Sequence, residues 1–247
     1  MKIRKKLASV IVTGALLASL PFNAFAKELD KEHFDYVALG DSLAAGRTPY
    51  AEHDKGYVDY LVDRFEQSQY NVEVDKYGVS GYRTTHIFDE LYNPTNGKYV
   101  ELQNSIKEAE LVTIDIGAND LLAQLPVIQQ DPTKAQSVLQ DIGKNLYSIL
   151  SAIDELNPNT KVYVMGYYNP FPYLPEEQQA QLLPLLDALN ETIETVAKQN
   201  GDIFIPTAKV IKKQEKEYIP NPADIHLSLE GYQTLAKEFW KGIMKNK

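Results

Sequence analysis

FDYVALGDSL, at residues 34–43, begins with a short run of aromatic and apolar side chains that ends at Gly40. Such a run, closed by a glycine, is typical of a buried β-strand. The polar pair Asp41-Ser42 follows at once and predicts a turn at the carboxyl end of that strand. Ser42 also opens the segment that leads into the next helix, so its backbone N–H can point toward a bound anion.

The rest of the chain repeats this alternation of strand and helix. Four further strands are predicted at residues 71–77, 111–116, 161–165 and 203–205. Helices are predicted at residues 56–67, 85–91, 99–108, 135–156, 182–200 and 229–244. Helical connections between successive strands favour parallel pairing. We therefore predict an α/β fold for the domain at residues 27–247, with a five-stranded parallel sheet between two layers of helices, which is a three-layer α/β/α sandwich.

Residues 1–26 have the features of a secretory signal peptide. Four basic residues precede a mainly apolar run at residues 7–20, and Ala24-Phe25-Ala26 matches the small-x-small pattern of a cleavage site. An uncleaved membrane anchor is the alternative, but the run is shorter than the roughly 20 residues that a bilayer span requires. We therefore expect cleavage after Ala26, a secreted protein, and no stable membrane insertion of the mature chain.

The composition of the mature chain excludes some classes of partner. Four of the 25 basic residues lie in the leader, so 21 basic and 34 acidic residues remain, a net charge of −13 with neutral histidines. A surface of this sign repels nucleic-acid phosphates, so we expect no nucleic-acid partner. The chain has no cysteine, and it therefore has no disulfide, no thiol nucleophile and no thiolate metal site. The sequence carries no signal for an oligomeric state.

Small and polar residues follow three of the predicted strands. The first strand leads to GDSL at residues 40–43, the second to GVSG at 78–81 and the third to GAND at 117–120. A fourth segment, DIH at residues 224–226, precedes the last predicted helix. Sites in open α/β sheets form beyond the carboxyl ends of the strands. We therefore expect these four segments to share one rim of the sheet.

The residue types in these segments suit nucleophilic attack on an ester. The hydroxyl of Ser42 becomes a nucleophile when a base, here His226, takes its proton. The attack creates a tetrahedral oxyanion, which backbone N–H groups and the amide of Asn119 can stabilise. Gly81 leaves its backbone open to close approach by a substrate.

The four segments resemble the motifs of the SGNH, or GDSL-type, hydrolases, and they occur in that family's order across nearly the whole mature chain. The resemblance implies a flavodoxin-like fold with Ser42 as nucleophile, His226 as base and Asp224 as the acid that orients the base. It also implies an oxyanion hole formed by the Ser42 N–H, the Gly81 N–H and the Asn119 amide. It implies no metal and no cofactor.

The acid is where the chain departs from the family pattern. The family usually places the acid three residues before the histidine, but that position is Ala223 here, and Asp224 lies two residues before His226. In an extended segment, side chains two residues apart point to the same side, so Asp224 can reach the imidazole; in a helical turn it cannot. A backbone carbonyl is the alternative partner for His226.

These observations predict a secreted serine ester hydrolase of the lipase/acylhydrolase type, with a small-molecule or lipid ester as substrate. The short aromatic loops favour small or medium acyl groups. Two alternatives stay open, a carbohydrate O-acetyl deacetylase of the same family and a secreted binding module that keeps the fold without turnover. A flavodoxin-like nucleotide binder is disfavoured because the chain has no G-x-G-x-x-G or Walker sequence.

Other polar residues near these segments have structural interpretations. Asp41 is expected to stabilise its turn by accepting backbone N–H groups. His86 lies close to Gly81 in sequence and is a candidate for the wall of the cleft, whereas His33 and His53 are expected on the surface. No pair of histidines has the helical spacing of a zinc site.

Two apolar segments are also of interest. Residues 167–173, YYNPFPY, either form the wall of an acyl pocket or pack on the core as a proline-bounded loop. The leucines within residues 182–189 are expected to be the buried stripe of a helix, because a helix in this fold must bury one face.

Overall fold

Five parallel strands form one sheet in the computed structural model, which describes residues 33–246. Across the sheet the order is β2-β1-β3-β4-β5. The strands are β1 (His33–Gly40), β2 (Asn71–Gly78), β3 (Leu111–Asp115), β4 (Lys161–Met165) and β5 (Ile203–Ile205). The predicted parallel sheet is confirmed, with every strand end within one residue of its predicted position. The predicted signal peptide at residues 1–26 lies outside the described residues.

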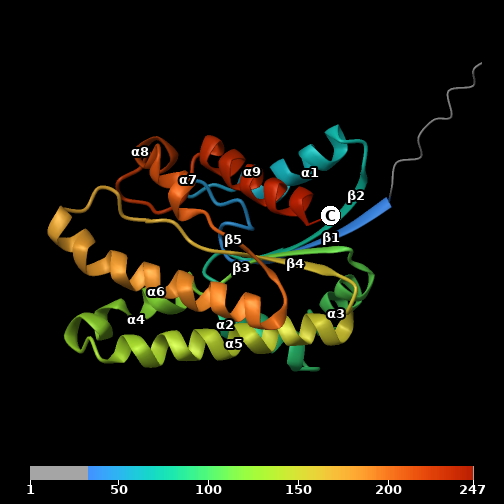
Figure 1. The fold of residues 1–247 in the computed structure, drawn as a ribbon, viewed down its shortest axis with the longest axis horizontal. Coiled ribbons are helices and arrows are strands. Elements are labelled where there is room, and N and C mark those ends of the chain that lie inside the picture. The colour runs from blue at the N-terminus through green and yellow to red at the C-terminus, as the bar shows by residue number, and fades with distance from the viewer. Residues whose placement is uncertain (1–32, 247) are drawn as a thin grey trace, which may run out of the picture. The chain divides into compact units, whose positions relative to one another are not determined.

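Helices cover both faces of this sheet, as Figure 1 shows. On one face lie α1, α7, α8 and α9, and on the other lie α2 to α6. The helices are α1 (Tyr57–Gln67), α2 (Thr84–Tyr92), α3 (Tyr99–Glu108), α4 (Ala118–Gln130), α5 (Lys134–Leu156), α6 (Glu176–Asn200), α7 (Ala208–Lys212), α8 (Glu215–Tyr218) and α9 (Leu229–Lys245). The predicted three-layer α/β/α sandwich is therefore confirmed.

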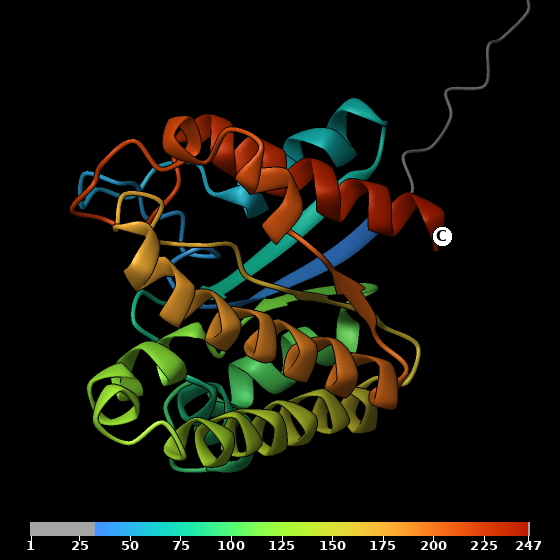
Figure 2. The ribbon, with the colours of Figure 1, turned by 60° about the vertical axis from the view of Figure 1, so that its left-hand side comes forward.

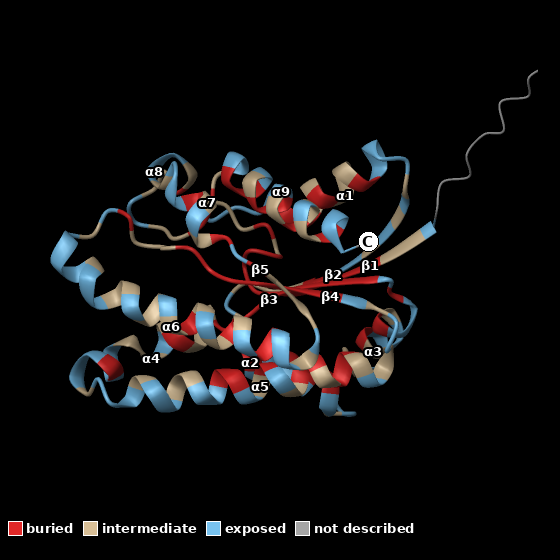
Figure 3. Cartoon of the chain, in the orientation of Figure 1, coloured by how far each residue is buried: buried red, intermediate tan, exposed pale blue. Residues whose placement is uncertain are grey.

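Burial is concentrated on the sheet and on the sides of the helices that face it (Figure 3). The central strand β3 is buried over its whole length because it has strands on both edges and helices on both faces. The predicted helix at residues 135–156 is α5, and its apolar stripe is buried at Ile142, Leu146, Ile149 and Ile153. No helix among residues 33–246 has the length and apolar character needed to cross a bilayer.

The loops that follow the strands gather at one end of the sheet. In Figures 1 and 2, the amino-terminal part of α6 and much of α4 project past the strand ends on this same side. Side chains on these projecting parts therefore border the space beyond the sheet, whereas the rest of α6 packs on β4 and β5. This arrangement sets the position and the shape of the site.

The sequence pattern did not indicate α4, α7 or α8. α4 contains Pro126 and buries only Leu121 and Ile128, so it lacks a long apolar stripe. α7 and α8 have five and four residues, which is too short for a periodic signal. α6 begins at Glu176, before its predicted start. The prediction started too late because the first five residues of the helix place no buried side chain on the core and so show no apolar pattern.

Asp202, at the start of β5, makes folding stability depend on pH. Burial and the neighbouring Asp154 raise the pKa of Asp202 to about 7, against a hydrogen bond from Asn200 that lowers it. A raised pKa means that the folded state keeps a proton that the unfolded chain releases near pH 4. The stabilisation from this group is therefore complete below about pH 4 and is lost as the pH rises through about 7.

Asp202→Asn is therefore expected to stabilise the protein at pH 8, relative to wild type, by about 1 kcal/mol after allowance for solvent screening. The advantage should shrink as the pH falls to 5. Urea unfolding of both proteins at the two pH values measures the difference. Asp141→Asn, on an exposed helix face, is the control and should show no such pH-dependent gain. A gain for Asp202→Asn that is equal at pH 5 and pH 8 would contradict the assignment.

Candidate active site

Ser42, His226 and Asp224 form a hydrogen-bonded chain at the carboxyl end of β1. The Ser42 Oγ lies 2.8 Å from the His226 Nε2, and the His226 Nδ1 lies 2.6 Å from the Asp224 Oδ1. Only 8% of Ser42 and 9% of His226 is exposed. This order of hydroxyl, imidazole and carboxylate is that of a nucleophile, its base and the group that orients the base.

Asp224 reaches the imidazole because the segment around it is not helical. The Asp224 Oδ1 also accepts the backbone N–H of His226, at 2.8 Å. Asn221 holds the start of this loop, since its amide donates to the Pro49 carbonyl at 2.7 Å and its oxygen accepts the Ala223 N–H at 3.0 Å. A carboxylate two residues before the histidine therefore lies where the imidazole needs it, and no backbone carbonyl has to take that place.

Asp115, the last residue of β3, supports the turn that carries Ser42, a role that the sequence pattern did not indicate. Its Oδ2 accepts the N–H groups of Asp41 at 3.2 Å and Ala44 at 3.3 Å, and its Oδ1 accepts the Tyr57 hydroxyl at 2.7 Å. A carboxyl group at the end of a wholly buried strand is the signal that could have identified it, because a buried charge requires partners.

Asp41 stabilises the same turn, as its sequence position suggested. Its Oδ1 accepts the Leu43 N–H at 3.0 Å, and its Oδ2 accepts the Tyr167 hydroxyl at 2.8 Å. Burial raises the pKa of Asp41, and burial together with the neighbouring Asp41 raises the pKa of Asp115 well above its ordinary value. The charge of Asp41 thus disfavours the charged form of Asp115 beneath Ser42.

Asn119 lies near the start of α4 and lines the same pocket as Ser42 and His226. Its Nδ2 donates to the Tyr82 carbonyl at 2.9 Å. This bond uses one of the two N–H groups of the amide and fixes its plane, so the other remains available to a ligand.

Gly81 lies in the turn after β2, directly before Tyr82, and is not among the residues that line the pocket. Its φ of +84° is in the left-handed region that favours glycine. Within residues 33–246, no protein group accepts the backbone N–H of Gly81 or of Ser42. Both N–H groups are therefore available to an anion.

An apolar pocket opens beside Ser42. It has a volume of about 740 Å³, its open mouth included, and its polar residues are Asp41, Ser42, Asn119, Asn169 and His226. Three leucines of α4 and five of α6 form much of the remaining wall. An apolar lining with few polar groups is typical of a small-molecule site.

The aromatic segment at residues 167–173 combines the two interpretations drawn from the sequence. Tyr167, Tyr168 and Phe171 line the pocket. Tyr167 and Tyr168 are also buried in the core. The Tyr168 hydroxyl donates to the Ile225 carbonyl at 3.1 Å, one residue before the histidine of the site. The segment therefore forms a wall and also fixes the loop that carries His226.

The prediction that the leucines within residues 182–189 form a buried stripe is confirmed only in part, because Leu185 and Leu186 pack against the core but stay half-buried. Leu189 is buried, but Leu182, Leu183, Leu185 and Leu186 are half-buried and line the pocket. The physical reason is that this part of α6 projects past the sheet, so that its apolar face borders the pocket (Figure 2).

His86 and His53 lie outside the pocket lining. The His86 Nδ1 accepts the Arg83 N–H at 2.9 Å, and its ring stacks on Tyr82 at 4.9 Å between centroids. The His53 Nε2 lies 3.3 Å from the Ser80 Oγ in an exposed loop. His86 therefore contributes to the start of α2 rather than to the cleft wall.

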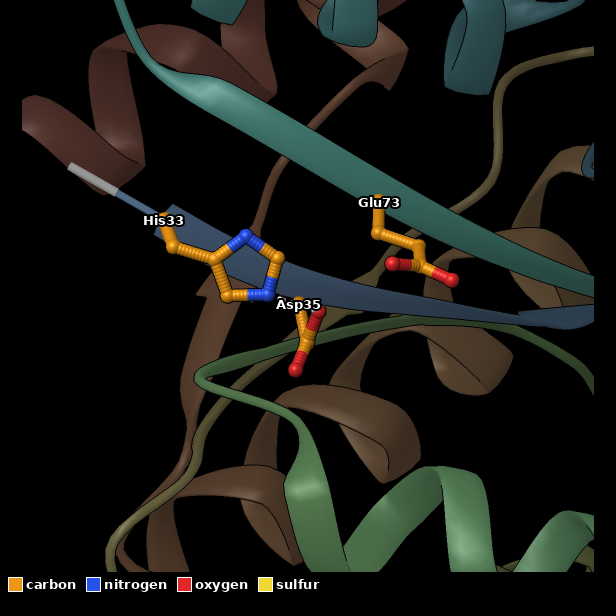
Figure 4. A group of neighbouring side chains, drawn as sticks. All are labelled: His33, Asp35 and Glu73. Carbon is orange, nitrogen blue, oxygen red and sulfur yellow. Dashed lines mark ion pairs between the residues drawn. The ribbon is translucent and has the colours of Figure 1, made fainter. Parts of the chain in front are cut away.

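His33, Asp35 and Glu73 form a group at the opposite end of the sheet (Figure 4). Their ligand atoms lie within 4.8 Å of one another, and the His33 Nε2 lies 3.0 Å from the Asp35 Oδ1. β1 runs from His33 to Gly40, so His33 lies roughly 23 Å, and Asp35 roughly 17 Å, along the strand from its carboxyl end. The group is a largely exposed cluster on the surface of β1 and β2, separate from the Ser42 site.

The fold and the hydrogen-bonded serine, histidine and carboxylate define a serine-hydrolase type of site on an α/β sandwich. The chain belongs to the GDSL-like Lipase/Acylhydrolase family, which it matches over residues 38–234. It is therefore an enzyme of the ester-hydrolysing class that this family comprises. The matched span includes Ser42, Gly81, Asn119, Asp224 and His226.

Curated proteins similar to this chain include two from bacilli. The chain is 28% identical to the uncharacterized protein YpmR of Bacillus subtilis (strain 168), over 87% of this chain and 83% of that protein. It is 26% identical to the spore germination lipase LipC of Bacillus licheniformis, over 82% of this chain and 93% of that protein. It is also 30% identical to an arylesterase of Vibrio mimicus, over 60% of this chain and 68% of that protein.

Solved structures share the fold. The lipase Lip_vut3 from a goat rumen metagenome has a TM-score of 0.71 at 24% identity. The alignment covers 86% of this chain and 97% of that chain. The acetylxylan esterase Axe2 of Geobacillus stearothermophilus has a TM-score of 0.62 at 18% identity, over 95% of that chain and 87% of this one. The same fold thus occurs in a protein named as a lipase and in one named as an acetylxylan esterase.

Proposed function

We propose that this protein hydrolyses carboxylic esters through an acyl-serine intermediate, with Ser42 as nucleophile, His226 as base and Asp224 as the acid that orients it. The observation that carries the proposal is the 2.8 Å and 2.6 Å hydrogen-bonded chain at the edge of an apolar pocket. Membership of the lipase/acylhydrolase family supports it. So do relatives named as a lipase and an arylesterase.

The reaction has two halves. The His226 Nε2 takes the Ser42 proton while the Ser42 Oγ attacks the carbonyl carbon, and the departing alcohol receives that proton from His226. Water then attacks the acyl-serine with His226 again as base, which releases the acid and restores Ser42. Asp224 holds the imidazole in the tautomer that has its free nitrogen toward Ser42.

The oxyanion formed in each half needs donors that are already in place. The Ser42 N–H, the Gly81 N–H and the free N–H of the Asn119 amide are the three donors in this proposal. Three features support this proposal: the Tyr82 carbonyl holds the Asn119 amide, Gly81 has a left-handed φ in the turn after β2, and Asp41 accepts the Leu43 N–H in the turn after β1. Such preorganised donors stabilise developing charge without reorganisation.

Asn119→Ala is expected to lower kcat by about 10²-fold or more, because it removes one oxyanion donor. The Michaelis constant should change little, since the donor acts on charge that develops in the transition state. Steady-state kinetics on p-nitrophenyl butyrate measure both constants. Asn145→Ala, which removes an amide bonded to Thr84 on the α2 side, is the matched control. A wild-type kcat for Asn119→Ala would show that the Asn119 amide is not an oxyanion donor.

Competition between water and methanol tests the acyl-serine intermediate. Butyrate esters with different leaving alcohols must pass through the same butyryl enzyme, so the ratio of methyl butyrate to butyric acid should be the same for each. A ratio that changes with the leaving group would contradict a shared intermediate. Absence of turnover with every ester would instead favour a binding module on this fold.

We also propose that the mature protein acts outside the cytoplasmic membrane. The basic start, the apolar run and the Ala24-Phe25-Ala26 site support export and cleavage. Amino-terminal sequencing of protein recovered from the medium of an expressing bacterium should begin at Lys27. Recovery of the chain with its first 26 residues still attached would contradict cleavage.

A further inference from the structure

The pocket beside Ser42 extends in one direction only. The strand order places β3 and β4 on one side of β1 and β2 on the other. The pocket lining comes from the segments after β1, β3 and β4, from α4, from α6 and from the His226 loop. The turn after β2 and the His53 loop lie outside the lining. An ester bound at Ser42 therefore has the apolar pocket toward α4 and α6, and the turn after β2 lies outside that pocket.

The apolar side is a groove between two helices. We call it the leucine groove and define it by Leu122 and Leu125 of α4 and Leu182, Leu186 and Leu189 of α6. Both helices pack on α5, but within residues 33–246 they make few contacts with each other. Their leucines therefore line a gap, and four of these five are half-buried rather than buried.

The leucine groove has no charged group along its length. The pocket residues that carry a carboxyl or imidazole group are Asp41 and His226, both at its Ser42 end, and Asp41 is bonded to Tyr167. The amide of Asn169 is bonded to Gln179, and its oxygen accepts the Phe171 N–H. An alkyl chain in the groove thus displaces water without desolvating a charged group. A sugar hydroxyl there would have no hydrogen-bond partner.

The length of the groove sets the length of the chain that it can bury. From Leu189 to Leu182, α6 rises about 10 Å, which matches an extended chain of roughly eight carbons. We propose that the leucine groove binds the acyl chain of the substrate, and that the alcohol leaves toward the β2 side. The preferred substrates are esters of linear fatty acids of about eight carbons or more. This inference rests on the proposed acyl-serine mechanism.

A chain-length series tests this inference on the wild-type protein. The substrates are p-nitrophenyl acetate, butyrate and octanoate, each below its aggregation limit, together with acetylated xylo-oligosaccharides. Each methylene buried from water contributes up to about fourfold to kcat/KM. We expect kcat/KM for octanoate to exceed that for acetate by at least tenfold. An equal or higher value for acetate, or faster release of acetate from the oligosaccharides, would overturn the inference.

Two variants locate the effect in the groove. Leu186→Trp and Leu125→Trp fill the groove from opposite walls, and each should lower the octanoate-to-acetate ratio of kcat/KM at least tenfold. Leu156→Trp, at the far end of α5 and outside the pocket lining, is the matched control and should keep the wild-type ratio. Circular dichroism checks folding.

The outcomes separate this inference from the proposed function. If both groove variants fold and keep the wild-type ratio, the acyl chain does not bind there, although ester hydrolysis at Ser42 stands. If Ser42→Ala hydrolyses these esters like wild type, the proposed function itself fails.

Discussion

Ser42→Ala is expected to lower kcat/KM for p-nitrophenyl butyrate by about 10⁵-fold. The substitution removes the nucleophile and leaves the pocket, the imidazole and the oxyanion donors in place. The remaining activity should therefore reflect binding and oxyanion stabilisation of a direct attack by water. Stopped assays at high enzyme concentration measure this residual rate above the uncatalysed background.

Ser80→Ala is the matched control for this variant. Ser80 lies in the turn after β2, and its hydroxyl is bonded to His53 rather than to His226. Its loss should leave kcat/KM within about twofold of wild type, because its hydroxyl is not part of the hydrogen-bonded chain of Ser42, His226 and Asp224. A Ser42→Ala variant that keeps wild-type turnover would contradict the assignment of the nucleophile.

His226→Ala is expected to reduce kcat by about 10⁵-fold as well, because Ser42 is a poor nucleophile without a base. The double variant Ser42→Ala/His226→Ala should be no slower than either single variant, since the two residues act as one unit. Steady-state kinetics on all three variants provide this cycle. Losses that multiply in the double variant would mean that the two residues act independently.

His86→Ala is the matched control for the histidine. His86 is exposed and bonded at the start of α2, so its loss should leave kcat close to wild type. If His86→Ala lowers kcat as strongly as His226→Ala, the base has been assigned to the wrong ring.

The sheet and its main helices could be predicted because their signals are local. The strands at residues 161–165 and 203–205 end where the sequence pattern places them, and the α5 stripe is the buried face of its helix. α4 was not indicated because it contains Pro126 and has too few buried apolar residues to show a helical periodicity. The first turns of α6 were not indicated because they bury nothing. Periodicity reports burial, and elements that border open space carry little of it.

The residues of the candidate site were predictable to different degrees. Ser42, Asn119 and His226 stand out because each follows a strand or precedes a helix within a recognisable motif, and the structure brings them to one pocket. Asp115 was missed because its role is to hold the Asp41–Ala44 turn, a contact between distant segments. The leucine groove was missed for a related reason, since an apolar stripe that faces a core and one that faces a ligand have the same spacing.

The central claim is that Ser42 carries the acyl group, and reaction with a fluorophosphonate tests it most directly. Such a reagent is attacked by an activated serine and leaves a stable phosphonyl group on it. Peptide mass spectrometry of the labelled wild-type protein should locate one adduct on Ser42, and His226→Ala should label far more slowly. An adduct on another residue, or equal labelling without His226, would contradict the account.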